Sequence, residues 1–488
     1  MSGKDAAIAF DNSYVGLPEH FYAKVAPTRV AQPGLIAFNT ELARQLGIDA
    51  DHLTSAEGLQ ILAGNELAAG SEPLAMAYAG HQFGNWVPQL GDGRAILLGE
   101  VHGLDGERYD IQLKGAGRTP FSRGGDGRNW IGPVMREYLI SEAMAAMGVP
   151  TTRALAAVTT GEHILRESGP MPGAIITRVA RSHIRVGTFQ FFTAREDESA
   201  VKTLIDYVIN RHYPEIASAE NTAHAMLDAV IKRQAELIAH WQSLGFIHGV
   251  MNTDNSSITG DTIDYGPCAF MDTFQADKVF SSIDQGGRYA YQNQPRLAHW
   301  NLANLAQCLL PFMHDEPEKA VELAQESINR FDELFISQYL TQMRAKLGLG
   351  EEQADDLELA SSLLHLMEEH KLDFTMTFRQ LTIRSATDPF APGGALYDWH
   401  LRWQQHLANS QQSEEAAVAI MKQHNPVLIP RNHQVEAVIE SGVKDADFTS
   451  FNRLLKAVTS PYNPQYEDSE YTQPPTEDQV VTQTFCGT

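Results

Sequence analysis

The sequence predicts an α+β protein: a small β-rich lobe with one inserted helix, then a larger, mostly helical lobe with extra C-terminal helices. Two observations predict this plan. Short β-rich runs alternate with glycine turns from 73 to about 187, whereas apolar residues recur at helical spacing after 197. The cleft between two such lobes is the expected place for a ligand.

The composition excludes several classes of protein. The chain has 488 residues, and 37 Lys and Arg against 61 Asp and Glu leave a net charge of −24. Nucleic acid and anionic membranes would be repelled, so neither is an expected partner. Three cysteines in so long a chain do not build a disulfide scaffold, and no apolar run is long enough to span a membrane. The first residues resemble neither a secretory nor a transit peptide, so we expect a cytoplasmic protein.

The first lobe is expected to contain five strands and one helix. The β-rich runs lie at 95–101, 109–113, 154–160, 163–167 and 174–180. The gaps between them are rich in Gly, Asp and Glu and are interpreted as hairpin connections. The inserted helix runs from Gly132 to Met147 with an apolar stripe, and Gly148 ends it.

The second lobe is expected to be mainly helical. Asn221 is a candidate N-cap for a helix that ends at Gly245, and a short β-like segment follows at 246–272. Helical patterns resume from 297 to 407. An acidic cluster in that stretch is interpreted as a solvated face, and it comprises Glu351, Glu352, Asp355, Asp356 and Glu358.

These changes in pattern divide the chain into five expected parts. They are an N-terminal extension that packs on the lobes (1–72), a nucleotide-binding β-rich lobe (73–197), a helical lobe with the catalytic and metal-binding loop (198–345), a helical C-terminal extension (346–460) and an extended or mobile tail (461–488).

Glycines and cations in the first lobe suit a phosphate-bearing ligand. Gly91, Gly93 and Arg94 lie in a turn before a strand, which alone is more typical of a plain hairpin turn than of a phosphate site. From 108 to 136, six basic residues stand against only two acidic ones, and five glycines lie between 115 and 127. Lys114 ends a strand, and Asp126 and Gly127 lie in the glycine-rich part. A phosphate site is favoured here over a basic surface loop.

Three more residues extend this set. Glu137, at the start of the inserted helix, is placed to hold Lys114 as the strand-Lys/helix-Glu pair does in kinases, although a solvated glutamate is the alternative. Arg178 and Arg185 are seven residues apart on a strand-like segment. Strict alternation puts them on opposite faces, so both reach one ligand only if the chain bends after Ala180.

The segment from 247 to 267 predicts a metal site. Gly260-Asp261 suits a two-residue hairpin turn, whose register would set Asn255 opposite Gly266 and diagonal to Asp264. An amide oxygen and a carboxylate would then converge on Mg²⁺ or Mn²⁺. Asp254, beside that site, is placed to accept a proton from an attacking hydroxyl. A polar surface hairpin is the alternative.

The order of these parts is that of a protein kinase. A glycine turn, a strand lysine, a helix glutamate, an Asp/Asn loop and Asp264-Tyr265-Gly266 follow one another. The kinase His-Arg-Asp is missing, and Asp254 directly precedes Asn255 instead of lying four residues before it. A protein-kinase-like two-lobed fold is therefore expected, without ordinary kinase motifs.

The sequence resembles the selenoprotein O family of kinase-like proteins over nearly its whole length. The matching motifs are YAGHQFG (78–84), LGDGRA (90–95), LKGAGRTPFSR (113–123), GDGR (125–128), REYL (136–139), TTRAL (151–155), SHIRVGTFQ (182–190), HGVMNTDN (248–255), DYGP (264–267), IPRNH (429–433) and the terminal CGT.

This resemblance implies transfer of AMP from ATP to Ser, Thr or Tyr hydroxyls of proteins, with the nucleotide reversed relative to kinases. It implies that Lys114, Arg178 and Arg185 grip the distal phosphates, Asn255 and Asp264 bind the metal, Asp254 is the base and Glu137 pairs with Lys114. The residues implied to line the nucleotide site are Gly91, Gly93, Arg94, Asp126 and Gly127.

The residues themselves do not indicate which phosphate is attacked. A protein kinase and a catalytically silent nucleotide-binding scaffold therefore stay as alternatives to the AMP transferase. Family members often carry Cys or selenocysteine near the end, here Cys486. Redox control involving Cys268 is one interpretation, and a buried, inert Cys268 is the favoured one. The acceptor proteins and the oligomeric state are not predicted.

Overall fold

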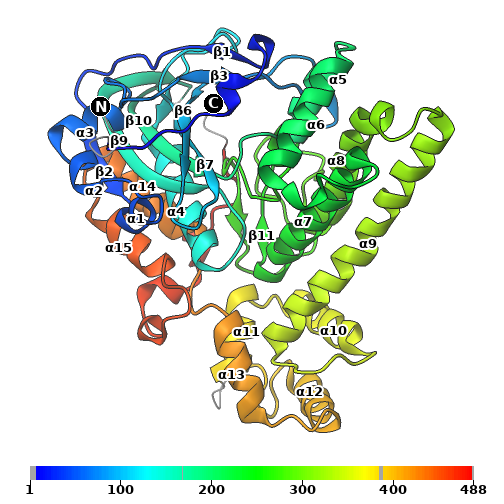
Figure 1. The fold of residues 1–488 in the computed structure, drawn as a ribbon. Helices are drawn as coiled ribbons and strands as arrows, with labels where there is room; N and C mark the ends of the chain where they lie inside the picture. The colour runs from blue at the N-terminus through cyan, green and yellow to red at the C-terminus, as the bar shows by residue number, and fades with distance from the viewer. Residues whose placement is uncertain (1–6, 168, 384–387, 486–488) are drawn as a thin grey trace.

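The computed structural model describes residues 7–167, 169–383 and 388–485, and it is a mixed α+β structure (Figure 1). Strands gather in the blue-to-cyan part of the chain, and helices make up most of the rest. No helix among these residues is both long and apolar enough to cross a membrane.

One antiparallel sheet of eight strands organises the first part of the described chain. Along its main path the strand order is β1-β3-β6-β7-β10-β9-β2, and β8 pairs with β10. The strands are β1 (Tyr22–Lys24), β2 (Gly34–Phe38), β3 (Leu74–Met76), β6 (Ala95–His102), β7 (Arg108–Lys114), β8 (Asn129–Trp130), β9 (Arg153–Arg166) and β10 (Gly169–Ala180). Residues before 73 therefore supply two strands of this sheet.

The predicted runs at 154–160 and 163–167 are one strand, so the hairpin expected between them is wrong. Both runs belong to β9, and the register with β10 shifts between Pro172 and Ala174, opposite Gly161. Gly161 has a φ of +72°. The glycine thus serves a β-bulge, which inserts extra residues without reversing the chain. The runs at 95–101, 109–113 and 174–180 match β6, β7 and β10.

The strands direct apolar side chains alternately to the two faces of the sheet. Helices therefore cover both faces. Leu97 packs in the same core as α4 (Ile131–Ala146), whereas Ile96 and Leu98 share a second core with the N-terminal helices. The latter are α1 (Thr40–Gln45), α2 (Ala50–Leu53) and α3 (Ala56–Leu62). The predicted inserted helix is confirmed as α4, and Gly148 follows it with a φ of +80°.

The next helices form the second part of the fold, on the right in Figure 1. They are α5 (Val186–Thr193), α6 (Glu198–His212), α7 (Thr222–Leu244), α8 (Gln294–Leu309) and α9 (Pro317–Leu347). The boundaries predicted for α7 are confirmed: the Asn221 side chain accepts a hydrogen bond from the His224 backbone N–H, and Gly245 adopts the left-handed conformation.

The segment 246–272 contains only two short paired strands, β11 (Phe246–Ile247) and β12 (Ala269–Phe270). The hairpin predicted around Gly260-Asp261 is wrong. Ser257 instead forms an isolated bridge with Arg185, and Thr262 forms one with Thr151. Long-range partners in the sheet region therefore replace the predicted local pairing, and the chain runs between them as a loop.

Six further α-helices lie in the described part of the chain after α9: α10 (Asp356–Glu369), α11 (Phe374–Ile383), α12 (Tyr397–Asn409), α13 (Glu414–His424), α14 (Asn432–Asp445) and α15 (Thr449–Val458). The first four lie at the bottom of Figure 1 and share an apolar core with the end of α9 and with β11 and β12, whereas α14 and α15 return to pack on α4. The interpretation of the acidic cluster as a solvated face is wrong for Asp356, which is buried.

The tail is tied to the loop that follows Asp264. The Thr484 hydroxyl donates to the backbone carbonyl of Pro267 at 2.5 Å, and its backbone N–H donates to Phe280 O at 2.8 Å. Cys268 is buried, as favoured from the sequence. Cys486 lies outside the described residues.

Candidate active site

The centre of the candidate site is a buried set of charges that joins the sheet to α4. Lys114, the last residue of β7, places its Nζ 2.8 Å from Glu137 Oε2. Arg178, on the neighbouring strand β10, donates from its Nε to the other carboxylate oxygen of Glu137. All three side chains are nearly completely buried. Because one carboxylate offsets only one of the two cations, one positive charge is left for a further anion.

Asp264 supplies that further anion. Its Oδ1 lies 3.2 Å from Lys114 Nζ and accepts a hydrogen bond from Arg178 Nη2 at 2.5 Å. Burial alone would raise the pKa of Asp264, but Arg178, Lys114 and Arg185 outweigh it and hold the pKa well below its usual range. Its φ of +63° is unusual for a residue other than glycine, so the surrounding contacts hold the backbone in a strained conformation.

The chain bends between Arg178 and Arg185, as it must if both side chains are to reach one ligand. β10 ends at Ala180, and Arg185 lies directly before α5. Arg185 Nη1 donates to the backbone carbonyl of Asp254 at 3.0 Å and lies 3.6 Å from Asp264 Oδ2. Arg178 and Arg185 therefore border the same cavity despite their seven-residue spacing.

Asp254 lies in a short 3₁₀ turn, Thr253–Asn255, and is only 6% exposed. Burial raises its pKa to about 6, although the Gln82 hydrogen bond and the charge of Arg185 oppose this shift. The neighbouring Asn255 donates its amide N–H to Val250 O at 2.9 Å, which turns its carbonyl oxygen away from that contact.

The glycine turns are required for close packing between loops. A Cβ at Gly91 would lie 2.3 Å from the Phe121 ring, and one at Gly127 would lie 2.1 Å from Gly117 O. Both glycines have positive φ values, +70° and +67°. Asp126, beside Gly127, pairs with Arg166 at 2.7 Å. The glycine-rich segment is thus held by its own contacts at the edge of the site.

These groups border a single cavity of about 1080 Å³. Of the residues singled out from the sequence, those that line it are Gly91, Gly93, Arg94, Lys114, Asp126, Gly127, Arg178, Arg185, Asp254, Asn255 and Asp264. Glu137 is not among its lining residues, but it contacts both Lys114 and Arg178. The structure therefore brings the selected residues together, although the hairpin argued for two of them does not exist.

Sequence reasoning missed three lining residues. The guanidinium of Arg185 stacks 4.2 Å above the Tyr78 ring, and buried Asp92 lies 4.0 Å from Arg185 Nη2. Gln82 donates to Asp254 Oδ2 at 3.1 Å. Tyr78 and Gln82 lie in YAGHQFG and Asp92 in LGDGRA. No periodicity or charge pattern distinguished them, so only their motifs offered a signal.

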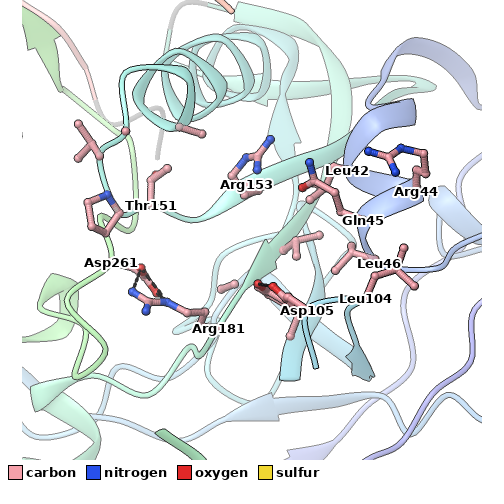
Figure 2. Close-up of a pocket in the computed structure, with 17 residues that line it drawn as sticks. Leu42, Arg44, Gln45, Leu46, Leu104, Asp105, Thr151, Arg153, Arg181 and Asp261 are labelled. Atoms are coloured by element: carbon pink, nitrogen blue, oxygen red, sulfur yellow. Dashed lines mark hydrogen bonds and ion pairs between the residues drawn. The ribbon is translucent and has the colours of Figure 1, made fainter. Parts of the chain in front are cut away.

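A second cavity, of about 670 Å³, lies between α1, the C-terminal end of α4 and strand β10 (Figure 2). Three arginines border it, but each is already paired with a carboxylate: Arg44 with Glu41, Arg153 with Glu142 and Arg181 with Asp261. These one-to-one pairs leave no surplus cation for an anionic ligand.

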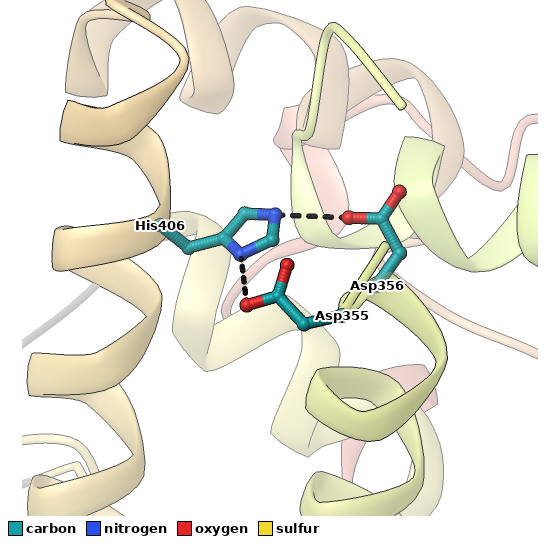
Figure 3. A group of neighbouring side chains, drawn as sticks. All are labelled: Asp355, Asp356 and His406. Atoms are coloured by element: carbon teal, nitrogen blue, oxygen red, sulfur yellow. Dashed lines mark hydrogen bonds and ion pairs between the residues drawn. The ribbon is translucent and has the colours of Figure 1, made fainter. Parts of the chain in front are cut away.

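A third group, Asp355, Asp356 and His406, has the residue types of a metal site (Figure 3). His406 Nε2 lies 2.9 Å from Asp356 Oδ1, and its Nδ1 lies 3.4 Å from Asp355 Oδ2. Arg344 adds a cation 3.6 Å from Asp356. Both ring nitrogens thus face carboxylates, one of buried Asp356 and one of exposed Asp355, so the cluster is explained as a partly buried polar network where α10 meets α12.

The fold and the site define an α+β protein with a cavity of about 1080 Å³ that is lined by cations, glycines and carboxylates. Comparison with known sequences then identifies the family. The family model described as "Protein adenylyltransferase SelO" matches residues 5–459, so the chain belongs to this family, as its resemblance to selenoprotein O predicted.

Curated relatives agree over nearly their full length. A protein of Bradyrhizobium diazoefficiens is 55% identical over 487 residues, which cover 98% of this chain and 99% of the relative. Two proteins of Rhodopseudomonas palustris, from strains HaA2 and BisB5, are 55% and 56% identical over 488 residues with the same coverage. All three relatives are named protein nucleotidyltransferase YdiU.

Proposed function

We propose that the chain transfers AMP from ATP to Ser, Thr or Tyr hydroxyls of other proteins. The observation that carries this proposal is the joint placement of Lys114, Arg178, Asp254 and Asp264 around one cavity. Cations suited to phosphate oxygens and carboxylates suited to a metal and a proton therefore meet at one place. Family membership and the name of the relatives support the same activity.

In this proposal the nucleotide lies in the cavity around Lys114. The distal phosphates bind to Lys114, Arg178 and Arg185. These buried side chains are already held in place, so they lose little conformational entropy when they bind a phosphate. Gly91, Gly93, Arg94, Asp126 and Gly127 line the remainder of the nucleotide site. Glu137 keeps Lys114 and Arg178 in place through its two carboxylate oxygens.

A divalent cation, Mg²⁺ or Mn²⁺, fits the donor set. Asn255 uses its amide N–H on Val250, so its carbonyl oxygen is the atom suited to a ligand, and Asp264 adds a carboxylate in the same cavity. Oxygen ligands of this kind suit both ions. Asn255 and Asp264 would hold the ion, whose positive charge would offset that of the phosphates.

The transfer itself requires a proton acceptor for the hydroxyl. Asp254 takes the proton as the hydroxyl oxygen bonds to the α-phosphorus. The bond from the α-phosphorus to its bridging oxygen breaks, and pyrophosphate leaves with the electron pair. The Gln82 hydrogen bond keeps the Asp254 carboxylate in one orientation, and Arg185 fixes the backbone of Asp254 through its carbonyl oxygen.

We further propose that this chain has a protein-kinase-like arrangement of two lobes. The strands and α4 within 73–197 would form the nucleotide-binding lobe, to which the extension 1–72 adds β1 and β2, and the helices from α6 onward would form the second lobe, 198–345. The extension 1–72, the helical extension 346–460 and the tail 461–488 would pack around these lobes. The antiparallel sheet with one long helix and the helix-rich remainder support this division.

The experiment uses ATP labelled on either the α- or the γ-phosphate, with Mg²⁺ or Mn²⁺ and a cell extract of proteins as acceptors. AMP transfer predicts that proteins retain the α label and that Asp264→Ala abolishes it. Retention of the γ label alone would mean a protein kinase. Measurable ATP binding without any retained label would mean a silent scaffold.

A further inference from the structure

Residues on two sides of the main cavity differ in chemistry. Around the glycine-rich segment, the lining includes four arginines: Arg118, Arg123, Arg128 and Arg166. Around Asp254, the lining includes an amide and apolar side chains: Gln82, Phe83, Val250 and Ile283. The arginines suit a nucleotide, whereas the second group suits part of a polypeptide.

The second group is anchored to the loop that carries Asp254. Strands β4 (Gly80–Gln82) and β5 (Asn85–Val87) form a separate hairpin. The His81 N–H donates to Thr253 Oγ1 at 2.7 Å, and the Phe83 N–H donates to Asn252 Oδ1 at 3.0 Å. The hairpin turn therefore has a fixed position beside the Asp254 carboxylate.

Within this arrangement the two oxygens of Asp254 differ. Oδ2 accepts the hydrogen bond from Gln82 Nε2, whereas buried Oδ1 has no hydrogen-bond partner among the described residues. A Cβ at Gly80 would lie 2.7 Å from Oδ1, so glycine lets the hairpin backbone pack directly against this oxygen. The hairpin therefore covers one oxygen of the carboxylate and holds the other through Gln82.

Two apolar side chains lie near the same place. Phe83 is half-buried, and its ring contacts Tyr289 at a centroid distance of 5.1 Å. Tyr289 belongs to the turn that follows Ile283, because its N–H donates to Asp284. Ile283 is 63% exposed although it lines the cavity. An apolar side chain of a bound polypeptide could cover both residues.

We propose, resting on the AMP-transfer function above, that the acceptor segment enters at the β4–β5 turn. Gln82 is a positioning residue that holds Asp254 Oδ2, so that the carboxylate keeps one orientation as it takes the hydroxyl proton. Phe83 and Ile283 bind an apolar side chain adjacent to the modified Ser, Thr or Tyr. The acceptor class is therefore an extended segment in which a hydroxyl residue has an apolar neighbour.

The first test compares Gln82→Ala with Asn85→Ala, a matched control at the cross-strand partner of Gln82. The probe is a pool of peptides with a central Ser, Thr or Tyr and randomised flanks, with α-labelled ATP. Gln82→Ala should lower kcat about tenfold or more while the Kd for ATP changes less than twofold. Asn85→Ala should match the wild type. In an Asp254→Asn background, Gln82→Ala should add no further loss.

The second test reads the flanks of the labelled peptides. Wild-type enzyme should favour an apolar residue beside the labelled hydroxyl, and Ile283→Asp should remove that preference without changing the Kd for ATP. Equal rates for Gln82→Ala and the wild type, or a wild-type preference for charged flanks, would overturn the inference alone. A wild-type enzyme that transfers α label to neither peptides nor proteins would overturn the proposed function and the inference with it.

Discussion

Lys114 and Asp264 are 150 residues apart in the sequence, yet Lys114 Nζ lies 3.2 Å from Asp264 Oδ1. Arg178 contacts the same carboxylate oxygen, and Glu137, on α4, contacts both cations. This contact joins the sheet to the loop after α7. Because the partners are buried, it fixes the geometry of the cavity before a ligand binds.

Glu137→Gln should destabilise the protein, because it leaves Lys114 and Arg178 with one fewer anion in a buried place. We expect the free energy of unfolding to fall by about 3–5 kcal/mol. Urea unfolding measures this change. The control is Glu66→Gln, whose exposed carboxylate pairs with exposed Arg29 and should cost about 1 kcal/mol or less. Equal effects of the two variants would contradict the account.

Lys114→Met should weaken ATP binding and spare the fold. Glu137 keeps its hydrogen bond from Arg178, so no carboxylate is left buried without a cation. We expect the Kd for ATP to rise about tenfold or more, as measured by titration with a fluorescent nucleotide. A melting temperature that falls as far as in Glu137→Gln would instead make Lys114 a structural residue.

Lys346→Met should stabilise the protein most at low pH. Burial lowers the pKa of Lys346 to about 7, and its Nζ lies 4.2 Å from the Phe378 ring centroid. Between pH 7 and about 10 the unfolded chain binds a proton that the folded chain lacks, so stability rises with pH. The protonated amine of Lys346 therefore lowers the free energy of unfolding most below pH 7.

The substitution should therefore raise the melting temperature more at pH 6 than at pH 9. Lys444→Met, at an exposed lysine paired with Glu440, is the control and should change little at either pH. A melting temperature for Lys346→Met that lies below that of the wild type at pH 6 would show that the charged amine stabilises the fold.

His406→Gln tests the polar network of Figure 3. Loss of the imidazole leaves the carboxylate of buried Asp356 with a weaker set of partners. We expect a loss of about 1–3 kcal/mol in the free energy of unfolding with an unchanged rate of AMP transfer. A metal chelator should leave the melting temperature of the wild type unchanged. A chelator-induced fall that His406→Gln removes would identify a metal site instead.

Local signals predicted those elements whose determinants are local. The cap residues of α7, Asn221 and Gly245, act within a few residues of the helix ends, and both of its boundaries were predicted. The residue types of the candidate site were also visible, because cations, glycines and carboxylates stand out in an acidic chain. Their convergence on one cavity required the fold.

Long-range contacts explain the errors. The predicted hairpin failed because Ser257 and Thr262 find partners at Arg185 and Thr151, far away in the sequence. Asp356 looked solvated within a run of acids, but Arg344 and His406 from other helices compensate its burial. Gln82 carries no recognisable pattern, and only its distance to Asp254 indicates a role.

The most direct test of the central claim is a crystal structure with a non-hydrolysable ATP analogue and Mg²⁺. The account predicts a nucleotide in the cavity around Lys114, with its distal phosphates against Lys114, Arg178 and Arg185 and its α-phosphorus nearest to Asp254. A γ-phosphorus nearest to Asp254, or a nucleotide in the cavity of Figure 2, would contradict it.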